Sequence, residues 1–176
     1  TGATSKSQCH ACQRGRYNPF EGLGGDCQVC PPGSHCPYLQ MSKYTDCSPG
    51  KYASKSEQTA CRDCPSGRYQ PEEGAAVCEA CPVGKYLPAM GSINSTSCIE
   101  CEAGSYNDKN GTAECSLCGK DTFAGGSGLS RCESCKDNST TQGLGPSFDG
   151  RGATECVAKT TACSPGFDRT TSGACE

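Results

Sequence analysis

The stretch "CRDCPSGRYQPEEGAAVCEAC", residues 61–81, begins and ends with a Cys-x-x-Cys pair, and the meaning of that pair decides the fold. Each pair has two interpretations. It is either one device, a clip for a metal ion or a redox dithiol, or a seam between two loops. In a seam, the first cysteine closes the loop behind it and the second opens the loop ahead. The two interpretations predict different proteins.

The composition favours a chain that is held together by disulfides. The 176 residues include 19 Cys, 23 Gly, 11 Pro and no Trp. Leu, Ile, Val and Phe make up only about 9% of the chain, well below the level of about 20% under which a charged chain is usually disordered. The cysteine content, about 11%, exceeds the roughly 8–10% that is typical of disulfide scaffolds. Because disulfides persist in oxidising compartments, we expect an extracellular or cell-surface protein.

Several functional classes are excluded or disfavoured. The net charge is −3 and no basic cluster is present, so nothing supplies the positive charge that nucleic-acid binding needs. No apolar run approaches the 20 or so residues that span a bilayer, and there is no signal peptide, which predicts a mature protein or a piece of a longer one. His10 and His35 belong to no constellation with a carboxylate or a Ser. We therefore expect no catalytic residue, no metal, no cofactor and no enzymatic activity.

The chain is an internal repeat. Cys-x-x-Cys occurs seven times, and many of the second cysteines begin a Cys-x-x-Gly-x-Tyr motif. The Gly predicts a tight turn with positive φ, and the Tyr, the one large side chain of each repeat, is expected to pack over the disulfides. A basic residue recurs between Gly and Tyr at Arg16, Lys51, Arg68 and Lys85. The Cys-x-x-Cys pairs are Cys9/Cys12, Cys27/Cys30, Cys61/Cys64, Cys78/Cys81, Cys98/Cys101, Cys115/Cys118 and Cys132/Cys135.

A second turn is predicted four residues before the cysteine that ends each loop. Gly74, Gly111, Gly128 and Gly152 occupy this position, and Asn94 occupies it before Cys98. Asn tolerates the left-handed conformation, so it is expected to replace Gly in that turn. No segment has helical periodicity, which predicts irregular loops with short hairpins.

We expect a small disulfide-rich fold, mostly irregular with short β-hairpins, arranged as an elongated tandem-repeat rod. Two of the segments are divergent: 30–46, which also holds a joint, and 135–162, which carries a long loop. The expected segments are 1–11 (the tail of a truncated repeat), 12–29, 30–46, 47–63, 64–80, 81–100, 101–117, 118–134, 135–162 and 163–176 (a terminal repeat).

The seam interpretation joins each cysteine that opens a loop to the next cysteine along the chain. It leaves Cys9 unpaired or paired upstream, as in a window cut from a longer array; an intermolecular bridge through Cys9 is the other option. Each closure of about 15 residues removes roughly 3 kcal/mol of unfolded-chain entropy. The expected bridges are Cys12–Cys27, Cys30–Cys36, Cys47–Cys61, Cys64–Cys78, Cys81–Cys98, Cys101–Cys115, Cys118–Cys132, Cys135–Cys156 and Cys163–Cys175.

Three alternatives to this pairing stay open. Cys36 and Cys47 are an alternative pair, with Cys30 joined elsewhere. Tandem Cys-x-x-Cys pairs also build tetrahedral zinc sites. A single Cys-x-x-Cys at a helix start would be a redox motif, but seven copies without that context disfavour it.

The motif Cys-Pro-x-Gly-x-Tyr, about ten residues and then Cys-x-x-Cys resembles the cysteine-rich modules of tumour necrosis factor receptors. It is more similar to the ephrin-receptor-like cysteine-rich repeats, an EGF-like class that recurs in large algal and ciliate surface proteins, including mastigoneme proteins. The resemblance is strong over 47–115 and weaker over 118–162, where "CGKDTF" and "CKDNST" lack the Gly. In the receptor family the Cys-Pro-x-Gly cysteine bridges to the first cysteine of the next pair, which implies Cys64–Cys78, Cys81–Cys98 and Cys101–Cys115.

Together these features favour a structural role. We expect a spacer or filament-forming array of a large surface or matrix glycoprotein, which associates with itself or with other matrix proteins. The alternative is the ligand-binding ectodomain of a receptor. If the chain is secreted, Asn94, Asn110 and Asn138 are N-glycosylation acceptors, because each begins an Asn-x-Ser/Thr sequon.

Overall fold

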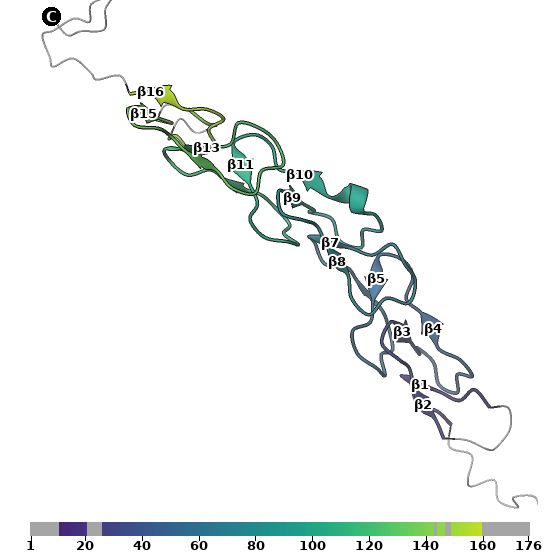
Figure 1. Cartoon of the computed structure of the whole chain (residues 1–176). Helices are drawn as coiled ribbons and strands as arrows, with labels where there is room; N and C mark the ends of the chain where they lie inside the picture. The colour runs from purple at the N-terminus through teal and green to yellow at the C-terminus, as the bar shows by residue number, and fades with distance from the viewer. Residues whose placement is uncertain (1–10, 21–25, 143, 147–148, 160–176) are drawn as a thin grey trace, which may run out of the picture.

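The computed structural model describes residues 11–20, 26–142, 144–146 and 149–159. Within these ranges the chain forms an elongated array of small loops that follow one another along its length (Figure 1). The regular structure of the described residues consists of two-residue strands and one three-residue 3-10 helix. The fold class expected from the sequence, a disulfide-rich rod with short hairpins, is confirmed.

The strands recur at two places in each repeat, one just after the first turn and one that in most repeats lies between the two cysteines of a Cys-x-x-Cys pair. The exceptions are Thr45–Asp46, which precede Cys47, and Val157–Ala158, which follow Cys156. The helix η2 (Ser95–Ser97) lies in the repeat that begins at Cys81. The strands are β1 (Arg16–Tyr17), β2 (Gln28–Val29), β3 (Ser34–His35), β4 (Thr45–Asp46), β5 (Lys51–Tyr52), β6 (Arg62–Asp63), β7 (Arg68–Tyr69), β8 (Glu79–Ala80), β9 (Lys85–Tyr86), β10 (Ile99–Glu100), β11 (Ser105–Tyr106), β12 (Ser116–Leu117), β13 (Thr122–Phe123), β14 (Glu133–Ser134), β15 (Ser139–Thr140) and β16 (Val157–Ala158).

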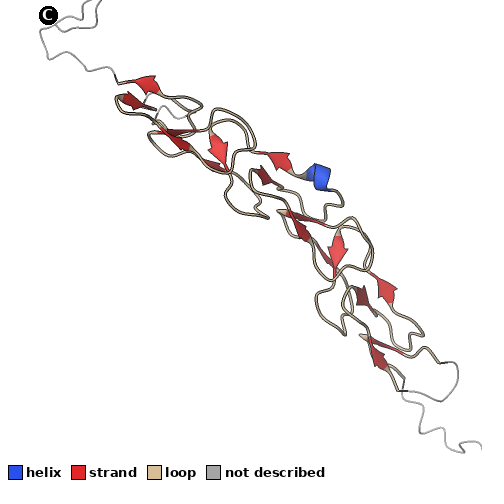
Figure 2. Ribbon diagram, viewed as in Figure 1, coloured by secondary structure: helices blue, strands red, loops and turns tan. Residues whose placement is uncertain are grey.

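Consecutive strands pair into eight antiparallel two-stranded sheets in the described part of the chain (Figure 2). In the hairpin of β7 and β8, Tyr69 lies opposite Glu79. The hairpin is closed at its base, because the Cys81 N–H donates to the Gly67 carbonyl at 2.9 Å. The two residues inside a Cys-x-x-Cys pair are thus a strand, and this strand separates the end of one loop from the start of the next.

The first turn of each repeat explains why its third residue after the cysteine is so often glycine. Gly67 has a φ of +83°, a conformation that an L side chain adopts only at a cost. The Arg68 N–H donates to the Pro65 carbonyl at 3.1 Å and closes the turn. The same conformation recurs at Gly15, Gly33, Gly50, Gly84 and Gly104.

The interior is a thin line of sulfur atoms and small side chains. The described cysteines that open the loops are buried except Cys135, which is half-buried, and Cys64 and Cys81 are fully inaccessible to solvent. Leu87 joins the Cys81–Cys98 disulfide in one buried cluster, and Tyr69 of the preceding repeat packs against it. The expected role of the Tyr as a cover for the disulfides is confirmed at this position.

Candidate functional site: the disulfide ladder and the repeat junctions

Eight disulfides form a ladder along the described residues. Each one joins a cysteine that opens a loop to the next cysteine in the sequence, so the two cysteines of a Cys-x-x-Cys pair always belong to different bridges. They are eight of the nine expected pairs; Cys163–Cys175 and Cys9 lie outside the described residues. The bridges are Cys12–Cys27, Cys30–Cys36, Cys47–Cys61, Cys64–Cys78, Cys81–Cys98, Cys101–Cys115, Cys118–Cys132 and Cys135–Cys156.

The alternative pair Cys36–Cys47 is wrong, because Cys47 is bonded to Cys61. The short loop from Cys30 to Cys36 is a variant of the same repeat. Tyr44 stands three residues before Cys47, where the other repeats have their closing cysteine, and its ring meets the ring of Tyr17 edge-on at a centroid distance of 5.3 Å. Cys36 takes a buried position inside the repeat instead.

Each described repeat up to the one that begins at Cys101 is bound to the next by three backbone hydrogen bonds. The repeats that begin at Cys118 and Cys135 are joined by two, and the third N–H, that of Asp121, donates to the Thr141 hydroxyl. At the junction of the repeats that begin at Cys81 and Cys101, the Gly84 N–H donates to Asn107 O at 2.8 Å and the Leu87 N–H to Thr112 O at 3.1 Å. In the opposite direction, the Gly111 N–H donates to Cys81 O at 2.8 Å. The last of these bonds recurs along the array from Gln40 to Cys12, Glu57 to Cys30, Gly74 to Cys47, Gly91 to Cys64, Gly128 to Cys101 and Gly152 to Cys118.

Each repeat also contacts the second repeat ahead. A Cβ placed on Gly84 would lie 2.1 Å from the carbonyl oxygen of Gly128, which belongs to the repeat after next. Only a residue without a side chain permits this approach. The same contact joins Gly15 to Glu57, Gly33 to Gly74, Gly50 to Gly91, Gly67 to Gly111 and Gly104 to Gly152.

From the repeat that begins at Cys30 onward, the sixth residue after the opening cysteine fills the space between two repeats and is buried. Where it is polar, its hydrogen bonds are made inside the array: Asn107 Nδ2 donates to Lys85 O at 2.6 Å, and Gln70 Nε2 to Val77 O at 2.8 Å. No buried side-chain nitrogen or oxygen of the described residues lacks a partner. This position holds Cys36, Ala53, Gln70, Leu87, Asn107, Ala124 and Thr141.

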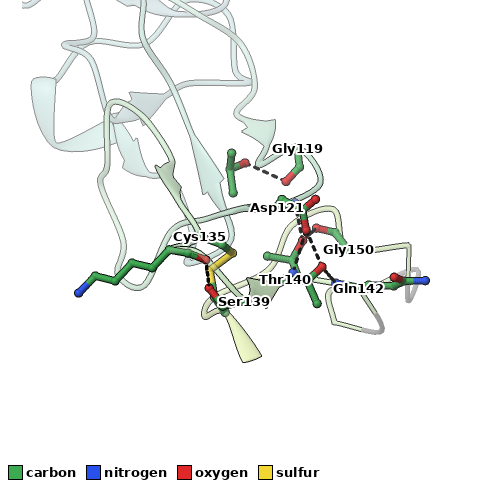
Figure 3. The surroundings of a disulfide bond; sticks show 11 residues. Gly119, Asp121, Cys135, Ser139, Thr140, Gln142 and Gly150 are labelled. Atoms are coloured by element: carbon green, nitrogen blue, oxygen red, sulfur yellow. Dashed lines mark hydrogen bonds between the residues drawn. A yellow bond between two sulfur atoms is a disulfide. The ribbon is translucent and has the colours of Figure 1, made fainter. Parts of the chain in front are cut away.

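Two repeats near the C-terminal end lack glycine in the first turn and keep its geometry. Asp121 and Asn138 stand there with φ of +59° and +63°. Figure 3 shows that the Asp121 side chain points toward Thr140 of the next repeat. The Thr140 hydroxyl donates to the Asp121 carboxylate at 2.5 Å, and the Asp121 N–H donates to the Thr141 hydroxyl at 2.8 Å. The Thr140 hydrogen bond lowers the pKa of Asp121.

The second turn of each repeat, which we call the return turn, differs from the sequence prediction at one residue. Asn94 is not in this turn, since its backbone is extended, with φ −133° and ψ 145°. Gly91 takes the turn instead, with φ +66°. Sequence reasoning also missed Gln40 and Glu57, which hold the same turn at φ of +59° and +64°. The other glycines expected there, Gly74, Gly111, Gly128 and Gly152, all have positive φ.

The recurring basic residues find partners inside the array. Lys51 forms an ion pair with Asp63, which lies opposite it in the hairpin of β5 and β6. Lys85 lies 3.5 Å from Glu100, again its cross-strand partner. Such exposed pairs contribute about 0–1 kcal/mol each, so their main effect is to balance charge along the rod.

The side chains of His35, Cys47 and Cys61 lie together among the described residues. His35 Nδ1 lies 3.3 Å from Cys61 Sγ and 3.1 Å from Thr45 O. His35, Cys47 and Cys61 place their ligand atoms within 4.8 Å of one another, but the two sulfurs are bonded to each other. The described part of the chain also holds no helix of the length and apolarity that a membrane span requires.

The comparison with known families agrees with this geometry. Residues 50–98 match the family model described as tyrosine-protein kinase ephrin type A/B receptor-like. The search of curated proteins finds no match. The matched residues include the whole loop closed by Cys64–Cys78 and the one closed by Cys81–Cys98, with the hairpins that link them. Residues 50–98 are therefore an ephrin-receptor-like cysteine-rich segment, and the disulfide ladder continues on both sides of it.

Proposed function

We propose that this segment is a spacer in a large extracellular structural protein, with a mechanical role and no catalytic one. The observation that carries the proposal is the double contact of each repeat. The repeat that begins at Cys81 is hydrogen-bonded to the next repeat and touches the one after it through Gly84. In most repeat proteins each unit contacts only its neighbours. Bending this array must therefore break contacts over three repeats at once.

The disulfides add a limit on extension. The Cys64–Cys78 bridge removes 14 residues from the load-bearing path, and an extended chain spans about 3.3–3.6 Å per residue. Opening that one bridge would lengthen the stretched chain by roughly 40 Å. A chain with intact bridges is thus short and stiff under load, as a spacer must be.

Force spectroscopy on single molecules tests this role. We expect the oxidised chain to give a short contour length, and the same chain in a reducing buffer to gain one extension step of roughly 40 Å for each fourteen-residue loop. A contour length that does not change on reduction would contradict the proposal. Electron microscopy of native material tests the finer proposal that such segments assemble into filaments of the mastigoneme type, which predicts polymers rather than single rods.

A receptor ectodomain is the second candidate, since the matched family is described after a receptor. Tyr38 and Leu39 support it, because they are adjacent and expose 70% and 60% of their surface, and aromatic residues are enriched in protein interfaces. Saturable 1:1 binding of a soluble protein, lost in Tyr38→Ser/Leu39→Ser, would favour this candidate over the spacer. Lys43→Ser, on the same loop, is the control.

A further inference from the structure

The repeat that begins at Cys81 contains an insertion at one defined place. In the other described repeats that have a closing cysteine after the return turn, that cysteine follows the turn residue by four positions, as Cys78 follows Gly74. Here Cys98 follows Gly91 by seven. The extra residues lie between Gly91 and Cys98, and this interval holds Asn94-Ser95-Thr96.

The chain stays anchored to the array up to Ile93 and then leaves it. The Gly91 N–H donates to Cys64 O at 2.8 Å, and the Gln70 N–H donates to Ser92 O at 2.9 Å. Ile93 Cγ2 lies 3.1 Å from the place where a Cβ on Gly50 would be. From Asn94 the backbone is extended and enters η2, which has no buried residue and projects from the side of the rod (Figure 2).

The Asn94 side chain has no structural duty in the described part of the chain. It is exposed, and it makes no capping hydrogen bond to the helix that it precedes. The neighbouring Ser95 and Thr96 are exposed as well. The segment from Asn94 to Thr96 is thus exposed, and its distinctive feature is an Asn-x-Thr acceptor sequence.

We propose that Asn94 carries an N-linked glycan. In this modification the Asn amide Nδ2 attacks C1 of a sugar on a lipid-linked oligosaccharide diphosphate. The Nδ2–C1 bond forms, the C1–O bond to the diphosphate breaks, and the amide nitrogen loses one proton as the lipid diphosphate leaves. Asn-x-Ser/Thr is the acceptor sequence for this transfer in secreted proteins, so the inference rests on the proposed extracellular function.

The other two sequons have structural explanations. Asn110 Oδ1 accepts the Val83 N–H at 3.0 Å and so helps to join two repeats. Asn138 forms the first turn of its repeat with φ +63°, and Thr140 of its sequon donates to Asp121. The contacts of these residues explain their presence even in a chain without glycans, whereas the fold gives no such reason for Asn94-Ser95-Thr96.

The test is to secrete the whole chain from eukaryotic cells behind a cleavable signal peptide. Release of the glycans by peptide N-glycosidase in heavy-oxygen water converts each modified Asn to labelled Asp, which peptide mass spectrometry locates. We expect label at position 94 in most molecules. Asn94→Gln and Thr96→Ala should each lower the intact mass by one glycan, while the matched variant Ser95→Ala should keep the glycan. The unfolding midpoint should not move in Asn94→Gln.

Two negative results have different meanings. If the disulfides form and position 94 carries no label, the glycan inference is overturned and the spacer proposal stands. If position 94 carries no label and the secreted protein also has free thiols throughout, the spacer proposal fails together with the glycan inference. A large fall in the unfolding midpoint of Asn94→Gln, measured on deglycosylated protein, would also overturn the inference, because Asn94 would then have a structural duty.

Discussion

The carbonyl oxygen of Gly111 lies 2.1 Å from the position that a Cβ on Gly67 would occupy, although the two residues are separated by a whole repeat. Gly67 is held in place by its hydrogen bond to Leu87 of the intervening repeat. Gly111 is held by its own bond to Cys81 of that same repeat. The contact therefore locks three consecutive repeats into one arrangement. It also explains why position 67 is glycine, because the turn conformation alone would favour glycine there without requiring it.

Replacement of that glycine should destabilise the array. In Gly67→Ala the new methyl group meets the Gly111 carbonyl, and the φ of +83° adds a cost of about 1–2 kcal/mol for an L residue. We expect a total loss of more than 2 kcal/mol, measured by denaturant unfolding with the disulfides intact. Gly126→Ala is the control, because a Cβ there meets nothing within 4 Å. Equal stability of the two variants would contradict the three-repeat contact.

Removal of one rung should open one loop. The double variant Cys64→Ser/Cys78→Ser deletes the closure of a loop that spans 14 residues, for which the chain-entropy model predicts a loss of about 3 kcal/mol. Limited proteolysis should cut this variant between positions 64 and 78, while the loops closed by Cys47–Cys61 and Cys81–Cys98 stay resistant. Cleavage spread over the whole chain would mean that the rungs do not act separately.

The stability of the C-terminal described repeats should depend on acid. Because the Thr140 hydrogen bond lowers the pKa of Asp121, the ionised carboxylate contributes stability above the ordinary Asp value of about 3.9. This contribution is lost as the pH falls through the lowered pKa. Asp121→Asn should remove that part of the acid dependence, since Asn tolerates positive φ and can still accept the Thr140 hydroxyl.

Thermal unfolding at pH 6 and at pH 2.5 measures this effect. We expect the fall in the midpoint between the two pH values to be smaller in Asp121→Asn than in the natural chain. Asp137→Asn is the control, because Asp137 is an exposed neighbour for which no hydrogen bond is seen. The fall in its unfolding midpoint between the two pH values should equal that of the natural chain. An unchanged fall in Asp121→Asn would show that the Thr140 bond has no energetic weight.

Much of the local structure could be predicted from the sequence, because it depends on residues that are close in the chain. The turn at Gly67, the strand that ends at Tyr69 and the Cys64–Cys78 bridge all follow from one motif. Asn94 misled the prediction, since a fixed count back from the cysteine cannot detect a three-residue insertion. Gly91 would have been the choice if the turn had been counted from the opening cysteine of its own repeat.

The contacts between repeats could not be predicted, because the period of a sequence does not say how its units stack. Glu57 gives no chemical signal of a left-handed turn, yet the array holds it at φ +64° through its hydrogen bond to Cys30. The partner of Lys51 was hidden for a similar reason. Asp63 becomes its neighbour only through the register of the hairpin.

The pairing of the cysteines is the central claim, and three consecutive Cys-x-x-Cys pairs allow it to be measured directly. Arg62, Glu79 and Glu100 lie between the two cysteines of their pairs, so digestion at Arg and Glu without reduction separates neighbouring rungs. Mass spectrometry of the fragments should then recover Cys64 linked to Cys78 and Cys81 linked to Cys98, with each fragment gaining two hydrogens per bridge on reduction. Recovery of Cys78 linked to Cys81, or of these cysteines as free thiols, would contradict the account.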